Sequence, residues 1–365
     1  MPRSSDVNLV FSPPSRRQFL LSSALGAAAV GAGAIGLEAF LAACGGTAST
    51  SSSSGTAAAA PQDVNWRLGW LAGSQQSGEF VAMEKGYFKT AGINLTVQPG
   101  GPNLDSVSLV ASGSATVGQI SSSPSLILAR SHGIPVKAFA SALQKHPFAW
   151  FSLKKDNISS PKDWVGKKIG IQGTARPLLN AVVSKFSLNP DSFQTVVIGS
   201  DTLPLVNGQV QAASGWVIDS AQAAPLPANG YNVMLLWDLG VQLYANPYFA
   251  TEDTIKKDKK MLEGFVTAAG KGWEYAFAHP EEAIDIVMKH VQALKRDQEL
   301  ATLKSMAPFT WNAATKKSGF GTMDLSLWQN QIDLYASLKL IDKSYPAADV
   351  ATLEILNAAP DRPKQ

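Results

Sequence analysis

The sequence predicts an α/β protein with two lobes. Short apolar strands alternate with helical segments from residue 64 to about residue 240, and strands separated by helices of this length favour parallel pairing in an open sheet. The chain has 365 residues, 45% hydrophobic and 16% charged, a globular composition with enough length for two lobes. The formal net charge is +3 and no basic stripe with interleaved aromatic residues occurs, so we expect no nucleic acid partner.

The N-terminal segment predicts export rather than a folded element. Arg16-Arg17 precedes an apolar run over residues 19–43, which is the form of a twin-arginine signal. The run ends in Leu-Ala-Ala-Cys at Cys44 and resembles a bacterial lipoprotein box. A single transmembrane anchor is the alternative, because the run is nearly long enough to span a membrane. We expect a signal peptide over residues 1–43, a lipid on Cys44 at the outer face of the bacterial cytoplasmic membrane, and a flexible tether over residues 44–62.

The elements of the first lobe follow from apolar periodicity and from helix-cap signals. Strands are expected over residues 64–71, 93–97, 115–119 and 134–141. Helices are expected over residues 79–87, after Asn103 as N-cap, and after Ser123 as N-cap with Pro124 in the first position. The Asn103 helix would bury Leu104, Val107, Val110 and Ala111 on one face. These elements form the first part of lobe one, over residues 63–150.

The second lobe is expected over residues 151–241. The apolar run Phe148–Leu153 fits the first crossing between the lobes, and residues 241–250 fit the return crossing. Strands are expected over residues 168–171, 195–198, 212–217 and 233–237, with Thr174 as N-cap of a helix between the first two. Residues 242–365 then hold the return crossing and helices that pack back on lobe one, expected over residues 259–278, 280–290, 298–306, 324–338 and 348–357.

Two polar loops each follow a predicted strand and precede a predicted helix. The first loop consists of Ser121, Ser122 and Ser123, and the second of Gln172, Gly173 and Thr174. Ligands bind at this position in open α/β sheets, because helix N-termini direct free N–H groups there. We expect the loops to form opposite walls of a cleft and to offer hydroxyl and N–H groups. Simple N-capping is the alternative for Ser123.

Several blocks of the sequence occur in the order and spacing of a known family. They are GEFVAMEKGYFKTAGINLTVQPGG, LVASGSATVGQIS, ARSHGIPVKAFAS and ISSPKDWVGKKIGIQGT, at residues 78–101, 109–121, 129–141 and 158–174. The chain resembles the substrate-binding proteins of ABC importers, in the branch that takes up thiamine-precursor pyrimidines, alkanesulfonates, taurine and nitrate. This resemblance implies a two-lobe periplasmic-binding-protein fold of type II, with two hinge crossings and ligand trapped between the lobes. It also implies a monomer that delivers ligand to an ABC permease and its ATPase, without a cofactor.

The resemblance points to an aromatic ligand contact at the end of the first strand. In the pyrimidine-binding relatives a tryptophan here contacts the ligand and is followed by Pro-Asn and a histidine. Trp70 is present in this chain, whereas Ala72, Gly73 and Gln76 replace the Pro, Asn and His. Trp70 offers a flat apolar face and one N–H donor, and Gln75 and Gln76 offer amides in the loop after it. The alternative is a core tryptophan beneath the first helix.

Further candidates lie in lobe two and in the return crossing. Trp216 and Asp219 end the third strand of lobe two, near the place where the pyrimidine-binding relatives set a glutamate against the ring's amino group. The alternative for Asp219 is an ordinary N-cap. Asn246 and Tyr248 could line the hinge side of the cleft, and the alternative for Tyr248 is a place in the core.

These observations predict a receptor for a small organic nitrogen or sulfur compound, with a pyrimidine-like heterocycle as one candidate. The alternative is an enzyme on the same fold, such as the pyrimidine synthases, whose sites are rich in cysteine and histidine. Cys44 is the only cysteine of the chain, and its four histidines lack the spacing of metal ligands. We therefore expect no enzyme activity and no metal.

Overall fold

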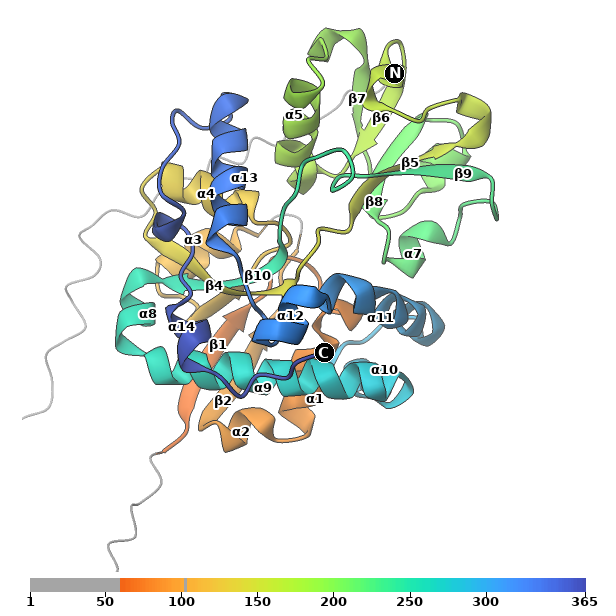
Figure 1. The fold of residues 1–365 in the computed structure, drawn as a ribbon. Coiled ribbons are helices and arrows are strands. Elements are labelled where there is room, and N and C mark those ends of the chain that lie inside the picture. Colours follow the sequence, from red (N-terminus) through yellow and green to blue (C-terminus); the bar gives the residue numbers. More distant parts are fainter. Residues whose placement is uncertain (1–59, 102–103) are drawn as a thin grey trace, which may run out of the picture. The chain divides into compact units, whose positions relative to one another are not determined.

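The computed structural model describes residues 60–101 and 104–365, whose backbone forms two five-stranded sheets (Figure 1). The first sheet has the strand order β2-β1-β3-β10-β4 and contains β1 (Gln62–Arg67), β2 (Ile93–Gln98), β3 (Val117–Gln119), β4 (Val136–Leu143) and β10 (Ala245–Thr251). The second has the order β7-β6-β8-β5-β9 and contains β5 (Phe148–Leu153), β6 (Lys168–Ile171), β7 (Gln194–Val197), β8 (Ala212–Trp216) and β9 (Tyr231–Leu235). Each sheet with its helices is one lobe, which confirms the predicted class and architecture.

Each sheet combines parallel and antiparallel pairs. In the first sheet β1 is parallel to β2 and β3, and β10 is antiparallel to β3 and β4. In the second sheet β6 is parallel to β7 and β8, and β5 is antiparallel to β8 and β9. The predicted parallel pairing therefore holds for three strands of each sheet, which are the strands joined through helical crossovers. The antiparallel strands are those that enter the sheet directly from a crossing between the lobes.

Two segments expected as crossings are strands instead. Phe148–Leu153 is β5, which is buried along its whole length between β8 and β9. Most of residues 241–250 belongs to β10, between β3 and β4. An apolar extended run buries its side chains and satisfies its backbone groups best inside a sheet, which explains both corrections. The crossings are the shorter segments 144–147 and 236–244, and Lys145 Nζ of the first lies 3.4 Å from Asp238 Oδ1 of the second.

The helices surround the two sheets. Lobe one has α1 (Ser77–Glu84), α2 (Tyr87–Thr90), α3 (Ser106–Ala111), α4 (Pro124–Ser131), α8 (Glu252–Lys257), α9 (Lys259–Ala278), α10 (Pro280–His290) and α14 (Glu354–Ala358). Lobe two has α5 (Arg176–Lys185), α6 (Leu203–Val206) and α7 (Ser220–Ala223). The C-terminal region also contains α11 (Arg296–Thr310), α12 (Ala313–Ser318) and α13 (Leu325–Ser337). The predicted helices 259–278 and 280–290 are confirmed with the same bounds.

The C-terminal helices contact lobe two as well as lobe one. The amide of Ser220, the first residue of α7, donates to Thr302 Oγ1 of α11 at 3.0 Å. The hydroxyl of Tyr335 in α13 donates to the carbonyl of Pro177 in α5 at 3.4 Å. These helices therefore make contacts with lobe two in addition to the expected packing on lobe one.

Two of the three predicted helix caps are wrong. Asp105 caps α3 and accepts hydrogen bonds from the amides of Val107 and Ser108, so the cap lies two residues after Asn103, which is outside the described residues. Leu104 consequently precedes the helix and is exposed. Helix α5 begins after Ala175 rather than after Thr174. The third prediction is confirmed, since Ser123 is the N-cap residue of α4 and Pro124 lies in its first turn, although the Ser123 side chain makes no capping bond. In each case the cap residue depends on where the chain enters the helix, which tertiary packing decides.

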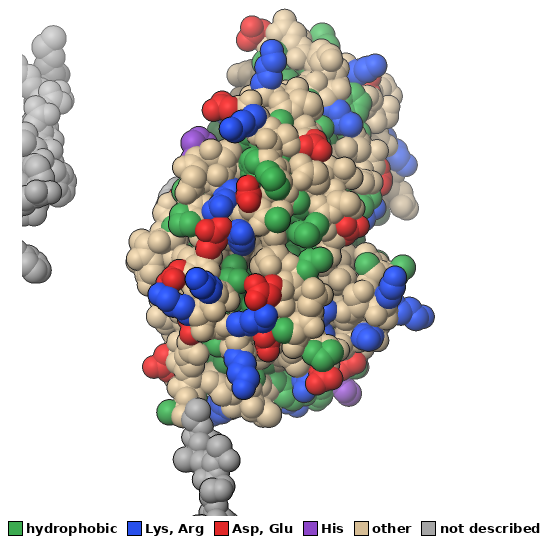
Figure 2. Space-filling view, turned by 60° about the vertical axis from the view of Figure 1, so that its left-hand side comes forward, with side chains coloured by type: hydrophobic (Ala, Val, Ile, Leu, Met, Phe, Trp, Pro, Cys, Tyr) green, Lys and Arg blue, Asp and Glu red, His purple; other side chains and the backbone are tan. Residues whose placement is uncertain are grey.

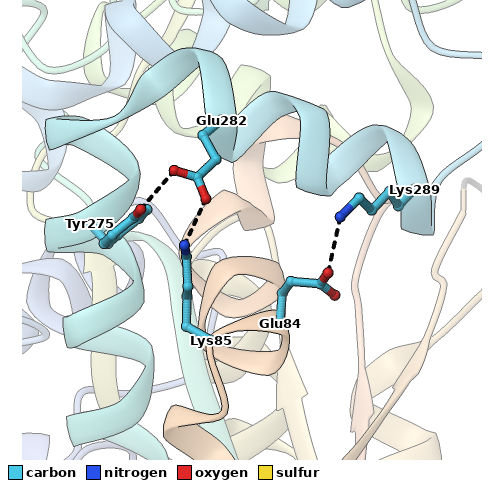
Figure 3. Close-up of polar contacts among 5 residues, drawn as sticks. All are labelled: Glu84, Lys85, Tyr275, Glu282 and Lys289. Carbon is cyan, nitrogen blue, oxygen red and sulfur yellow. Dashed lines mark hydrogen bonds and ion pairs between the residues drawn. The ribbon is translucent and has the colours of Figure 1, made fainter.

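Helix α1 is fixed tightly against α9 and α10. A Cβ atom on Gly272 of α9 would lie only 1.8 Å from the carbonyl oxygen of Gly78 in α1, so these backbones are in direct contact. On the surface, Glu282 accepts from Lys85 Nζ at 2.6 Å and from the Tyr275 hydroxyl at 2.7 Å (Figure 3). A second ion pair joins Lys289 to Glu84 at 3.0 Å (Figure 3). This packing fixes the loop before α1, which holds Trp70 and Gln75.

The surface carries charges of both signs. Lys and Arg side chains are interspersed with Asp and Glu on the face drawn in Figure 2. Within residues 60–101 and 104–365, no helix has the length and apolar character needed to span a membrane. The expected signal peptide, Cys44 and nearly all of the expected tether lie outside the described residues, and β1 begins at the last tether residue, Gln62.

Candidate functional site

A cavity of about 160 Å³ lies between the two sheets and has walls from both lobes. Lobe one contributes the residues after β1 and β3 and the start of α3, and lobe two contributes the residues after β6 and β8. Eight of the predicted ligand residues line this cavity, and they come from four separate loops: Trp70, Gln75, Ser121, Ser122, Gln172, Thr174, Trp216 and Asp219. The arrangement brings together the polar loops that the sequence places far apart.

Trp70 lies where β1 ends, and it is half-buried in the wall of the cavity. The chain reaches this position through Gly69, where a Cβ atom would lie 2.8 Å from Ile120 Cα and 2.9 Å from Gln119 O. Only glycine allows the end of β1 to approach the end of β3 so closely. This contact sets Trp70 beside the serine loop that follows β3. The position at the cavity favours the ligand role of Trp70 over a place in the core.

The three serine side chains of the loop after β3 have two different roles. Ser121 and Ser122 line the cavity, and Ser122 Oγ is buried without a partner among the described residues. Ser123 is fully buried and donates its hydroxyl to Gln331 Oε1 of α13 at 2.6 Å. Ser123 therefore holds a C-terminal helix instead of facing the cavity, which corrects its expected place there.

The opposite wall comes from lobe two. The Gln172 amide N–H donates to Ser214 Oγ at 3.1 Å, and its side-chain Nε2 is buried without a partner among the described residues. Thr174 lines the rim, whereas Gly173 is exposed and does not line the cavity. A Cβ atom at Gly173 would contact nothing within 4 Å, so no close backbone approach requires glycine here. Trp216 closes this wall at the end of β8.

Asp219 is the N-cap that one of the two interpretations predicts, and its carboxylate also lies at the cavity. Its carboxylate caps α7 by accepting from the amide of Gln222 at 3.1 Å, and it also lines the cavity. Burial raises the pKa of this carboxyl above its usual range. Gln222 in turn accepts the backbone N–H of Trp216 through Oε1 at 2.7 Å, which fixes the strand end that carries the indole.

Three predicted ligand residues lie in the core of lobe one instead. Gln76 is buried and donates to Gln119 Oε1 at 3.0 Å, Tyr248 is fully buried and donates its hydroxyl to Glu79, and Asn246 is buried in β10 with a φ of 50°. Asn246 and Tyr248 therefore belong to a buried central strand rather than to a crossing, and neither is part of the cavity lining. The core alternative for Tyr248 is therefore correct.

His146 lines the cavity and was missed by the sequence reasoning, which weighed the histidines only as metal ligands. It lies in the first crossing, directly before the proline that leads into β5. Its Nδ1 accepts the amide N–H of Phe148 at 3.1 Å, and burial lowers the pKa of the ring to about 3. A polar residue beside a proline at the start of a buried strand is the signal that could have identified it.

The charges of the lining carry information about the ligand. Asp105 and Asp219 line the cavity, and no lysine or arginine belongs to its described lining. Arg176, in the turn beside Thr174, is exposed and is not part of the cavity lining. Within the described residues no group of three or more His, Cys, Asp or Glu side chains could hold a metal ion.

The sequence matches the NMT1/THI5 like family over residues 74–283, which is more than half of the chain. The chain belongs to this family. The matched region contains α1, both crossings and every lining loop except the one that carries Trp70.

Proteins similar to this chain differ in function. The chain is 27% identical to the riboflavin-binding protein RibY of Chloroflexus aurantiacus over 297 residues, covering 77% of this chain and 84% of that protein. It is 25% identical to the formylaminopyrimidine-binding protein of Halalkalibacterium halodurans, covering 74% and 84%. A 4-amino-5-hydroxymethyl-2-methylpyrimidine phosphate synthase of Legionella pneumophila is 24% identical, with coverage of 61% and 72%.

Solved structures share the fold of this family member. The alkanesulfonate-binding protein SsuA of Xanthomonas axonopodis, bound to MOPS, superimposes with a TM-score of 0.60 at 15% sequence identity. The match covers 81% of this chain and 99% of that protein. The two lobes described above therefore have the fold of periplasmic binding proteins.

Proposed function

We propose that this protein is the exported solute-binding receptor of an ABC importer. The observation that carries the proposal is the cavity between the sheets, whose walls come from both lobes and include two tryptophans and polar groups that have no partner among the described residues. A ligand in this place would contact both lobes at once and would favour their closed arrangement, because it binds that arrangement better. The names of the relatives that bind riboflavin or formylaminopyrimidine support this role.

The ligand we infer is an uncharged nitrogen heterocycle with one ring. A cavity of about 150 Å³ is known to hold benzene, and the cavity here is about 160 Å³. The indoles of Trp70 and Trp216 offer flat faces for a ring. Asp105 and Asp219, with no cation in the described lining, disfavour sulfonate and nitrate, since a buried anion needs a paired positive charge. A flavin would need a wider separation of the lobes.

The partners follow from the same proposal. The closed, ligand-bound form would dock as a monomer on a membrane permease, which an ATPase powers. A lipid on Cys44 would hold the receptor at the outer face of the cytoplasmic membrane. The two crossings, joined on the surface by the Lys145–Asp238 ion pair, would allow the lobes to move relative to each other.

Isothermal titration calorimetry on the protein from residue 57 onward tests this proposal. We expect binding of formylaminopyrimidine or 4-amino-5-hydroxymethyl-2-methylpyrimidine, and none of an alkanesulfonate or nitrate. Trp70→Ala should weaken binding at least about 30-fold, because a stacked indole is a large desolvated contact. Trp311→Ala is the matched control, since Trp311 is a half-buried tryptophan of the C-terminal region that does not line the cavity.

Other outcomes would overturn particular parts of the proposal. Tight sulfonate binding would contradict the ligand class. Conversion of a bound pyrimidine into a product by the purified protein, followed by mass spectrometry, would favour the synthase alternative. A large fall in melting temperature of Trp70→Ala with unchanged affinity would make Trp70 a core residue.

A further inference from the structure

His146 has a fixed place between the two lobes. It lies in crossing 144–147, which is bonded to the C-terminal region by the Gln144 amide that donates to the Phe309 carbonyl at 2.7 Å. On the other side, the carbonyl of Pro147 accepts the Val217 amide of lobe two at 3.0 Å. The histidine ring therefore stands at the hinge side of the cavity.

The hydrogen bond from Phe148 decides which ring nitrogen carries the proton. A backbone N–H can only donate, so Nδ1 must accept the 3.1 Å bond from the Phe148 amide. The neutral ring then has its proton on Nε2. The indole of Trp216 packs edge to face against the imidazole of His146, at a centroid distance of 5.4 Å and an interplanar angle of 71°. The ring cannot turn without losing both contacts.

The Nε2–H group has no partner among the described residues, although it is buried. An unmade buried hydrogen bond costs roughly 1–3 kcal/mol. Two more polar atoms of the cavity lining share this condition: Ser122 Oγ in lobe one and Gln172 Nε2 in lobe two. The unpartnered groups thus stand on both walls and at the hinge of one cavity.

We propose that His146 is a specificity-determining residue that donates a hydrogen bond from Nε2 to an acceptor atom of the bound ligand. The inference rests on the proposed receptor function and narrows it. The ligand must present a ring nitrogen or a carbonyl oxygen toward the hinge, and it must do so without a negative charge, because the donor is a neutral ring in a lining with two carboxylates. The side-chain N–H of Gln172 would contact the heterocycle of the ligand from lobe two.

Two substitutions separate the ligand contact from the contact that holds the ring. In His146→Asn the side-chain oxygen can still accept the Phe148 amide, but no N–H reaches the cavity. In His146→Gln the longer amide can set an N–H near the former position of Nε2. Calorimetry with formylaminopyrimidine should show about tenfold to hundredfold weaker binding for the asparagine variant and a loss of no more than about fivefold for the glutamine variant.

The ligand supplies a second arm of the test. An analogue with C–H in place of a ring nitrogen should bind the wild type less tightly, and His146→Asn should bind the analogue and the parent equally if that nitrogen is the acceptor. Equal losses for Asn and Gln, or an unchanged affinity in both variants, would overturn the assignment while leaving the receptor function intact. Failure of the wild type to bind any pyrimidine would instead remove the proposed ligand class and this inference with it.

A spectroscopic measurement keeps the inference testable even if a variant does not fold. In the wild type, nitrogen-15 spectra of the histidine side chains should show the neutral Nε2–H tautomer of His146 in the free protein. Addition of formylaminopyrimidine should shift the Nε2 proton and slow its exchange with water. A proton on Nδ1, or an Nε2 resonance that does not respond to saturating ligand, contradicts the proposal.

Discussion

Glu79 is an acid buried in the core of lobe one, on α1. Its Oε1 accepts the Tyr248 hydroxyl and lies 3.3 Å from the indole nitrogen of Trp273, whereas Oε2 has no partner among the described residues. Burial raises the pKa of Glu79 to about 7, despite these hydrogen bonds, which act in the opposite direction. The group is therefore neutral at mildly acidic pH and must ionise inside the core at higher pH.

The stability of the protein should depend on this ionisation. A carboxyl whose pKa is higher in the folded than in the unfolded state holds its proton more tightly when folded, so its contribution is complete below about pH 4.5 and is lost as pH rises through about 7. The loss amounts to about 3 kcal/mol of unfolding free energy. Glu79→Gln removes this titration. In urea unfolding, the free energy of unfolding of the variant relative to that of wild type should therefore be higher at pH 8 than at pH 5.

The control is Glu84→Gln on the same helix. Glu84 is exposed, and its hydrogen bond from Lys289 lowers the pKa of its carboxyl, so it stays ionised from pH 5 to pH 8. Its substitution should leave the pH profile of stability parallel to that of wild type. If Glu79→Gln also gave a parallel profile, Glu79 would not titrate in this range.

At the scale of elements, the close contact of α1 and α9 is the most demanding packing in lobe one. Gly272 and Gly78 allow two helix backbones to touch, and a Cβ atom on Gly78 would lie 2.2 Å from the Trp273 ring. Apolar spacing predicted α9 with its bounds, but it did not predict which face required glycine. That requirement exists only because α1 lies against α9 in the folded protein.

Gly272→Ala should be strongly destabilising. The new methyl group would meet the Gly78 carbonyl at 1.8 Å, and a backbone group cannot move aside as a flexible side chain does. We expect a loss of at least about 3 kcal/mol in unfolding free energy, at the upper end for an overpacked core. Gly199→Ala is the control, because a Cβ atom there meets nothing within 4 Å. Thermal unfolding of both variants checks the prediction, which an unchanged midpoint for Gly272→Ala would refute.

At the scale of the whole molecule, the proposed lipid anchor decides where the receptor works. If Cys44 carries the lipid, Cys44→Ala should move the protein from the membrane fraction to the soluble fraction without changing its affinity for ligand. Fractionation of cells followed by immunoblotting measures this. Unchanged membrane association would favour a transmembrane anchor over residues 19–43, and replacing Arg16-Arg17 by Lys-Lys should separately block export.

The sequence by itself determined the class of the fold and most of its elements. Period-two and helical patterns are local, so strands such as Lys168–Ile171 and helices such as Lys259–Ala278 could be predicted with their bounds. The blocks typical of the family identified the two-lobe architecture. Trp70, Ser122 and Gln172 could be chosen because each lies in a polar loop at the end of a strand.

Only the tertiary structure decided how the two lobes are joined and which side chains face the cavity. Phe148–Leu153 and residues 241–250 have the composition of any extended apolar run, and strand pairing between distant segments made them central strands. Because of that pairing, Tyr248 and Asn246 are buried in a central strand, and the crossings consist of shorter segments. His146 reached the cavity for the same reason: its place depends on where the crossing begins, and contacts far apart in sequence set that point.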